Sequence, residues 1–138
     1  MRVRGTEFRV LEPTAIEDYH AHLGRLDRRS RFPGIDDRSI DAHCLNLVAS
    51  GAILIGAYVD GVMRAAAEIV PDRTARHAEA AITVENGYQD NGFDRELTAR
   101  VIDEARRYHL NNLRLHERSA VTSYKISAFG PRAYAANG

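Results

Sequence analysis

Two apolar runs in the middle of the chain, joined by Asp60-Gly61, constrain the fold more than any other feature. The first run is Ala52 to Val59 and the second is Val62 to Val70. Two such runs separated by Asp-Gly predict a β-hairpin, because glycine accepts the positive φ that a type I′ turn requires. His77 to Val84 follows a polar turn and predicts a third antiparallel strand. The centre of the chain is therefore expected to form an antiparallel sheet.

The hydrophobic period changes between Asp94 and Tyr108, where apolar residues recur every three or four positions. That period predicts an amphipathic helix. Leu113 to His116 then predicts a short strand. The order strand, glycine-containing loop, helix, strand is that of a right-handed βαβ unit, so the strand at 113–116 is expected to lie parallel to the strand at 77–84.

The first fifty residues predict one strand and two helices. Phe8 to Glu12 forms the expected strand. Thr14 and Glu17 have the spacing of a capping box, which places the start of the first helix at Thr14. The second helix is expected to begin near Asp36-Asp37, acids suited to a helix N-terminus, and to end at Ser50-Gly51. We therefore expect an α/β (α+β) fold in which a mixed sheet is flanked by helices.

Length and composition narrow the classes of function. A chain of 138 residues predicts a single domain over residues 1–138. Nineteen basic and nineteen acidic residues cancel, which argues against a nucleic acid or an anionic membrane as partner. One cysteine, Cys44, allows no internal disulfide, and no stretch approaches the roughly 20 apolar residues of a membrane span, so we expect a cytoplasmic protein. The histidines lack the spacing of metal ligands, and no metal site is expected.

The segment Ala78 to Leu97 reads AEAAITVENGYQDNGFDREL. Its strand, loop and helix resemble those of the GNAT N-acetyltransferase superfamily, in which a central strand leads into a loop of pattern Q/R-x-x-G-x-G/A. Gln89 and Gly92 match the first two fixed positions of that pattern, and Asp94 departs from the third. The order of elements extends the resemblance from about Phe8 to Glu117. It implies a mostly antiparallel GNAT-like sheet with the βαβ unit at the acyl-CoA loop.

The resemblance implies transfer of an acetyl or acyl group from acetyl-CoA to an amine, borne by a small molecule or a protein, that attacks the thioester directly. By position, the backbone of Ile82, Thr83 and Val84 is expected to face the pantetheine arm. The loop is expected to wrap the pyrophosphate with the residues Gln89, Asp90, Asn91, Gly92, Phe93 and Asp94. The physical basis is that N–H groups at a helix N-terminus lack intrahelical partners and favour anions.

Two properties of the loop favour an alternative. At about 4–6 Å and an effective dielectric near 20, each carboxylate of Asp90 and Asp94 disfavours a phosphate charge by about 3 to 4 kcal/mol. Asn91 as N-cap, with Asp94 three residues on, would satisfy the helix without any ligand. The alternative is a catalytically silent GNAT-fold module that regulates or binds a ligand through protein–protein contacts. The sequence alone does not decide between the acyltransferase and the silent module.

Three residues are candidates for proton transfer. Glu79 stands ten residues before Gln89, where many family members carry an acid, and is the expected general base. Its alternative role is a solvated or ion-paired strand glutamate. Glu68 on the neighbouring strand is a second base candidate. Tyr124 occupies the position of the family's general acid, in an expected helix after the fifth strand, and its alternative role is packing.

The C-terminus departs from the family pattern. The family fold continues with a helix and two strands, and too few residues follow His116 for all three. We therefore expect the C-terminal strands to be missing and residues 128–138 to be frayed. A sheet edge left uncovered in this way invites pairing with a second copy of the chain, which predicts a homodimer.

Overall fold

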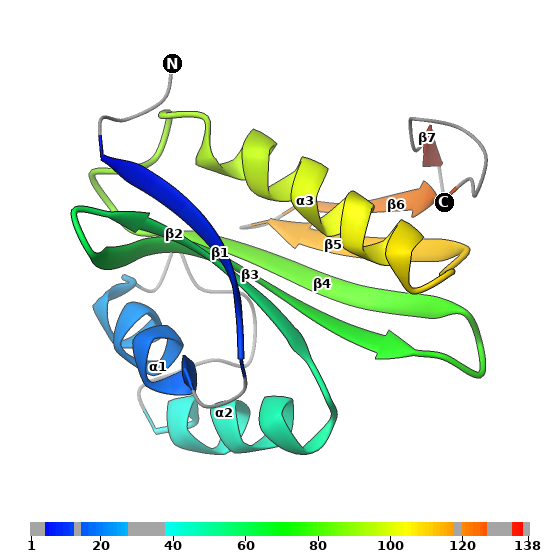
Figure 1. Cartoon of the computed structure of the whole chain (residues 1–138), viewed down its shortest axis with the longest axis horizontal. Helices are drawn as coiled ribbons and strands as arrows, with labels where there is room; N and C mark the ends of the chain where they lie inside the picture. Colours follow the sequence, from blue (N-terminus) through cyan, green and yellow to red (C-terminus); the bar gives the residue numbers. More distant parts are fainter. Residues whose placement is uncertain (1–4, 13–14, 28–37, 118–119, 127–133, 137–138) are drawn as a thin grey trace.

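The computed structural model describes residues 5–12, 15–27, 38–117, 120–126 and 134–136. Within these ranges the strands lie side by side in chain order in one seven-stranded sheet (Figure 1). The elements, in order, are β1 (Thr6–Leu11), α1 (Ile16–Arg25), α2 (Ile40–Ala49), β2 (Ile53–Val59), β3 (Val62–Asp72), β4 (His77–Val84), α3 (Phe93–Arg107), β5 (Asn112–Glu117), β6 (Ala120–Lys125) and β7 (Tyr134–Ala136). The predicted α/β fold class is confirmed.

The central hairpin and the βαβ unit form as the sequence predicts. Asp60 and Gly61 both have positive φ, 51° and 84°, as a type I′ turn requires. β4 pairs antiparallel with β3 and parallel with β5, and the parallel register runs from His77 opposite Asn112 to Ile82 opposite Glu117. Every other neighbouring pair of described strands is antiparallel. The sheet is therefore mixed and mostly antiparallel.

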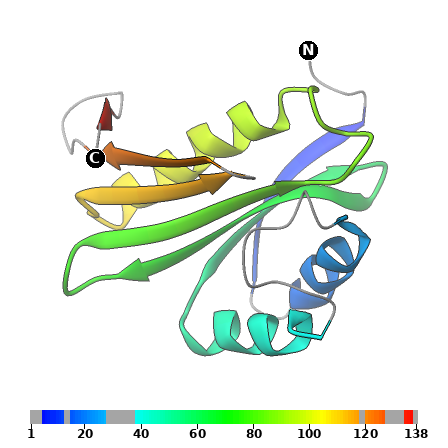
Figure 2. The same ribbon diagram turned by 180° about the vertical axis from the view of Figure 1, so that it is seen from behind.

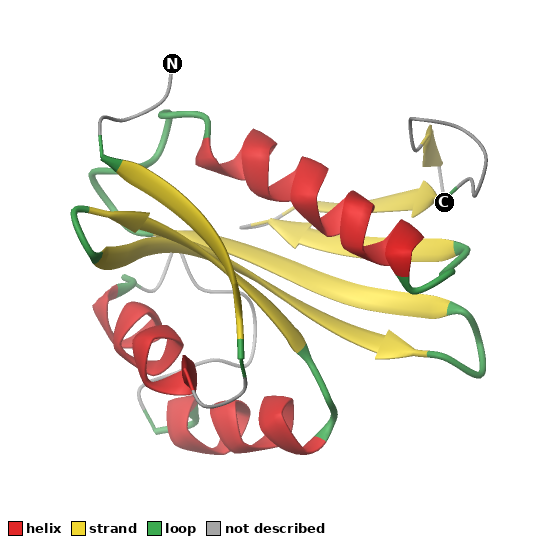
Figure 3. Cartoon of the chain, viewed as in Figure 1, coloured by secondary structure: helices red, strands yellow, loops and turns green. Residues whose placement is uncertain are grey.

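Helices cover both faces of the sheet. Figures 1 and 2 show α3 on one face and α1 with α2 on the other, and Figure 3 shows the same layers by element type. The core on the α3 side includes Ile55, Ile69, Ile82, Leu97 and Leu115. The core on the α1/α2 side includes Tyr19, Leu23, Leu47, Leu54 and Ala66. Because strand residues alternate between faces, Ile82 faces α3, and Glu79, Ala81 and Thr83 share the opposite face, as predicted.

The first helix begins two residues later than expected. α1 begins at Ile16, its N-cap is Ala15, and no described side chain caps it. Thr14, on which the expected capping box depends, lies outside the described residues. α2 ends at Ala49 with Ser50 as C-cap, as predicted. The predicted start of this helix at Asp36-Asp37 also lies outside the described residues.

The C-terminal expectations need correction. After two residues, β5 is followed by β6, which carries Tyr124, so the expected helix is absent at that position. The run Val121 to Tyr124 is rich in β-branched and aromatic side chains, which favour a strand. β6 and β7 extend the sheet beyond β5, and the predicted loss of both strands is wrong. Of residues 128–138, only Tyr134–Ala136 are described, as β7.

Candidate active site

The pairing between β4 and β5 ends before β4 itself ends. Their register ends at Ile82 opposite Glu117, whereas β4 continues through Thr83 and Val84. On its other side β4 remains paired with β3 as far as Val84. Among the described residues, no strand therefore pairs with the backbone edge of Thr83 and Val84 that faces β5. An extended ligand has access to backbone hydrogen-bonding groups along this edge.

The loop after β4 leads into α3, and no described side chain caps the N-terminus of this helix. Gly92 is the N-cap, with a φ of 82°, and no described side chain makes a capping hydrogen bond there. Asn91 Nδ2 instead donates to the Gln89 carbonyl at 3.4 Å, so the expected capping by Asn91 is wrong. Gln89 Nε2 donates to the Val84 carbonyl at 3.3 Å and ties the loop to the end of β4. The first N–H groups of α3 thus stand at the positive end of a 15-residue helix dipole.

Three carboxylates surround this helix N-terminus. Asp90 and Asp94 are both exposed, so water screens their charges. The third is Glu117, whose Oε1 lies 3.1 Å from the Thr98 hydroxyl in the second turn of α3. Glu117 is the last residue of β5 and lies where β4 and β5 diverge. The sequence predicted the strand but not that its end meets α3, because that contact depends on the parallel register.

Glu79 lies on the α1/α2 face of β4 near one arginine and two histidines. Its Oε1 is 3.4 Å from Arg114, and its Oε2 is 3.6 Å from His77 Nε2 and 3.8 Å from His116 Nε2. Its side chain is 44% exposed. At about 3.3 Å per residue, Glu79 is roughly 13 Å along the strand from Thr83. The geometry is that of the ion-paired strand glutamate, and the role of Glu79 as general base stays a prediction.

Tyr124 sits in a strand, half-buried against the core beneath α3. Burial, together with the charge of Glu117, raises the pKa of its phenol. It pairs with Leu113, which is level with Ala78 near the start of β4. That level is roughly 20 Å along the strand from Val84 at about 3.3 Å per residue. The backbone of Tyr124 is therefore far from the β4–β5 opening, although its phenol senses the charge of Glu117 there, and the role of Tyr124 as general acid stays a prediction.

A buried ionic network joins α1 to the end of β4. Glu85, 4% exposed, accepts hydrogen bonds from Arg25 Nε and Arg64 Nη1, both at 3.0 Å, and lies 2.9 Å from His22 Nδ1. His22 Nε2 is 2.8 Å from the Thr83 hydroxyl. Burial by itself would raise the pKa of Glu85, but the His22, Arg25 and Arg64 hydrogen bonds hold it at about 2. This network fixes the strand end that leads into the loop.

Nothing in the local sequence marks that network, because its members are up to 63 positions apart. The burial of His22 decides its protonation. Desolvation lowers the pKa of this imidazole, although Glu85 acts in the opposite direction. The one available signal is a polar residue, His22, on the apolar stripe that also carries Tyr19 and Leu23.

A second buried carboxylate lies between both N-terminal helices and β3. The Tyr19 hydroxyl donates to Glu68 Oε1 at 2.5 Å, and His43 Nε2 lies 2.7 Å from the same oxygen. Glu68 is 5% exposed. Burial and the adjacent Glu68 charge raise the pKa of Tyr19 well above its ordinary value, so this hydroxyl acts as a donor. The sequence singled out Glu68 but gave no sign of its two partners.

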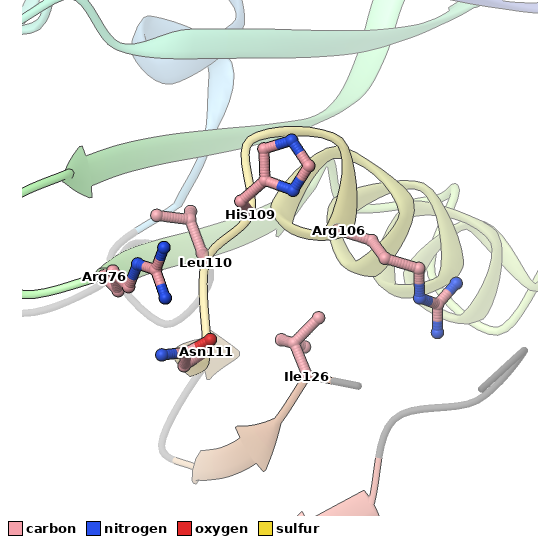
Figure 4. Close-up of a pocket in the computed structure, with 6 residues that line it drawn as sticks. All are labelled: Arg76, Arg106, His109, Leu110, Asn111 and Ile126. Atoms are coloured by element: carbon pink, nitrogen blue, oxygen red, sulfur yellow. The ribbon is translucent and has the colours of Figure 1, made fainter. Parts of the chain in front are cut away.

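A pocket of about 200 Å³ lies at the other end of the molecule, near the C-terminus of α3 (Figure 4). Its lining residues are Arg76, Arg106, His109, Leu110, Asn111 and Ile126. The pocket is therefore separate from the loop at the N-terminus of the same helix. Among the described residues no three His, Cys, Asp or Glu side chains gather as metal ligands, and no helix has the length and apolarity to cross a bilayer.

Solved structures with the same arrangement are GNAT acetyltransferases. An acetyltransferase of the GNAT family from Streptococcus pneumoniae superposes with a TM-score of 0.63 at 19% identity, covering 80% of this chain and 73% of that one. The chain adopts the GNAT fold. The ribosomal-protein-S18-alanine N-acetyltransferase from Escherichia coli gives 0.62 at 22% identity, covering 80% and 65%. The PaiA N-acetyltransferase from Thermoplasma acidophilum, in complex with coenzyme A, gives 0.61 at 14% identity, covering 80% and 77%.

The GNAT fold is thus established by architecture and not by sequence likeness. No protein-family model and no curated protein sequence matches this chain. The fold resemblance drawn from the motif at Gln89 to Asp94 is confirmed. A strand, β6, stands at Ala120–Lys125, where a helix was expected from the GNAT resemblance.

Proposed function

We propose that this protein is an N-acyltransferase that uses acetyl-CoA or a related acyl-CoA as donor. The observation that carries the proposal is the α3 N-terminus, where Gly92 is the N-cap and no described side chain caps it, beside the edge of β4 at Thr83 and Val84 that no described strand pairs with. A helix terminus of this kind supplies N–H donors to a pyrophosphate. A Cβ added at Gly87 or Gly92 would meet no atom within 4 Å, so the space before these donors is open. The residues present fit the group.

The chemistry follows from this placement. The loop from Gln89 to Asp94 would hold the pyrophosphate, and the backbone of Ile82, Thr83 and Val84 would hold the pantetheine arm. The thioester would then lie at the β4–β5 opening. An amine entering from the α1/α2 face would lose a proton to a base and attack the carbonyl carbon, and the CoA thiolate would leave. The acceptor is a small-molecule or protein amine.

A second function is favoured by the carboxylates around the loop. Asp90, Asp94 and Glu117 together place three acids near the expected phosphate path. Like charges there weaken binding of CoA. The alternative is therefore a catalytically silent GNAT-fold module that regulates a partner through protein–protein contacts.

A thermal-shift titration with acetyl-CoA separates the two functions. A ligand that binds only the native state stabilises it by about 2.7 kcal/mol at 100 times its Kd. We expect acetyl-CoA to raise Tm and Gly92→Pro to abolish the rise, because the ring fixes φ near −65° where the native value is 82°. Gly24→Ala, in open space on α1, is the matched control and should keep the rise. No rise at millimolar acetyl-CoA would refute the transferase.

A further inference from the structure

The carboxylate of Glu68 is held by one of its two oxygens. Tyr19 and His43, from α1 and α2, both engage Oε1, at 2.5 and 2.7 Å. No hydrogen bond from the described part of the chain engages Oε2. One oxygen is thereby fixed by two partners while the other keeps its lone pairs. A carboxylate held in this way keeps a fixed orientation and can accept a proton on its second oxygen.

Packing does not account for this arrangement. A buried carboxylate is unfavourable unless its partners compensate for lost hydration, and apolar replacements are often as stable. The neighbours of Glu68 along the same face of β3 are Ala66 and Val70, both apolar. A buried acid that is held by two specific partners, on the sheet face that also carries Thr83, is a candidate for function.

The register brings Glu68 nearer to the reacting region than Glu79. Glu68 pairs with Ala81, whereas Glu79 pairs with Val70 farther from the opening. With about 3.3 Å per residue and about 4.8 Å between strands, Glu68 lies roughly 8 Å from Thr83, and Glu79 lies roughly 13 Å away. Both carboxylates share a face with Thr83. Between Glu68 and β5 stands Ala81, whose side chain is only a methyl group.

We propose that Glu68 is the general base of the transfer and that Tyr19 and His43 are positioning residues; this inference rests on the acyl transfer proposed above. The acceptor ammonium loses one proton to Glu68 Oε2. Its nitrogen then forms the bond to the thioester carbon, and the carbon–sulfur bond breaks. The thiolate takes the second proton that the nitrogen loses, and Glu68 releases the first to solvent. The products are the amide, CoA thiol and one proton.

His43 supports the return of that proton. Its side chain is 21% exposed, against 6% for that of Glu68, so it lies on the solvent side of the cluster. Tyr19 is fully buried and holds the carboxylate from the inside. The cluster therefore has a fixed inner end and an outer end in contact with water.

The test measures thiol release from acetyl-CoA with benzylamine or hydroxylamine as nucleophile. Benzylamine is protonated at neutral pH and needs a base, whereas hydroxylamine is uncharged and does not. We expect Glu68→Gln to lower kcat with benzylamine about 100-fold. The same variant should keep its acetyl-CoA affinity and its hydroxylamine rate within about threefold. Glu7→Gln, an exposed acid at the β1 edge, is the control and should match the wild type.

Each outcome decides between the proposals. No thiol release by the wild type refutes the proposed function itself. Release at the wild-type rate by Glu68→Gln refutes only the inference about Glu68, as does loss of the benzylamine reaction in Glu79→Gln alone. If Glu68→Gln fails to fold by circular dichroism, Tyr19→Phe decides. It should lower kcat about tenfold with KM for acetyl-CoA unchanged, and an unchanged kcat would overturn the inference.

Discussion

The Glu85 network allows a quantitative prediction about stability. Glu85→Gln keeps the shape of the side chain but removes the charge that His22, Arg25 and Arg64 share. The pKa of Glu85 falls from 4.5 to about 2 in the folded protein. At 1.36 kcal/mol per pKa unit this corresponds to about 3 kcal/mol. Since Arg25 and Arg64 are 36% and 28% exposed, solvent screens part of it, and we expect a loss of about 2 kcal/mol.

The contribution of Glu85 to the free energy of unfolding depends on pH in a definite direction. The folded pKa is depressed, so the stabilisation is complete above about pH 4.5 and is lost as pH falls towards about 2. Urea unfolding at a series of pH values measures it as a free energy of unfolding. We expect the difference between wild type and Glu85→Gln to be about 2 kcal/mol at pH 6 and to shrink as the pH falls below 4.5.

Glu7→Gln is the matched control, because its carboxylate also binds an arginine but belongs to a side chain that is 60% exposed. It should leave the free energy of unfolding unchanged. A loss below about 0.5 kcal/mol in Glu85→Gln, or a difference that does not vary with pH, would contradict the assigned role of this network.

Three further predictions concern the loop, the buried imidazole and assembly. Asp94→Asn and Glu117→Gln each remove a carboxylate near the expected phosphate path, and each should tighten acetyl-CoA binding about three- to tenfold, as measured by calorimetry. Weaker binding would show that these acids are not near the phosphates. The lowered pKa of His22 means that the unfolded chain takes up a proton first, so the free energy of unfolding should fall below about pH 6.5, and His22→Gln should flatten that slope. A homodimer was expected at the sheet edge that missing C-terminal strands would leave, but β6 and β7 extend the sheet there, so we propose it through the edge at β1. It requires a molar mass of twice 15.4 kDa by light scattering, and the monomer mass at micromolar concentration would exclude it.

Local patterns were sufficient for the elements with strong periodicity. The hairpin at Asp60-Gly61 forms because these two residues tolerate the positive φ that the turn needs. α3 forms from its apolar stripe, and the βαβ unit follows from the rule for parallel connections. The segment of Tyr124 could not be predicted from the family pattern. Its position in the family predicts a helix, whereas its β-branched neighbours and the edge of β5 favour a strand.

The phosphate loop was also only partly predictable. Its position between strand and helix follows from the sequence, and so does the flexibility supplied by Gly92. Whether Asn91 caps α3 depends on which way its side chain turns, and it turns back to the Gln89 carbonyl. Gly92, as N-cap, has no side chain that could accept hydrogen bonds from the first N–H groups of α3, which leaves these groups available to a ligand.

By itself the sequence determined the GNAT-like order of strands and helices, because turn residues and hydrophobic periods act over a few positions. The tertiary structure alone decided which acids meet which partners. Glu68 joins Tyr19 and His43 across 49 and 25 positions, and Glu85 joins His22 across 63. Such contacts depend on sheet register and on how the two N-terminal helices dock, which no local pattern encodes. The fold therefore follows from short-range chemistry, whereas the candidate base follows from long-range packing.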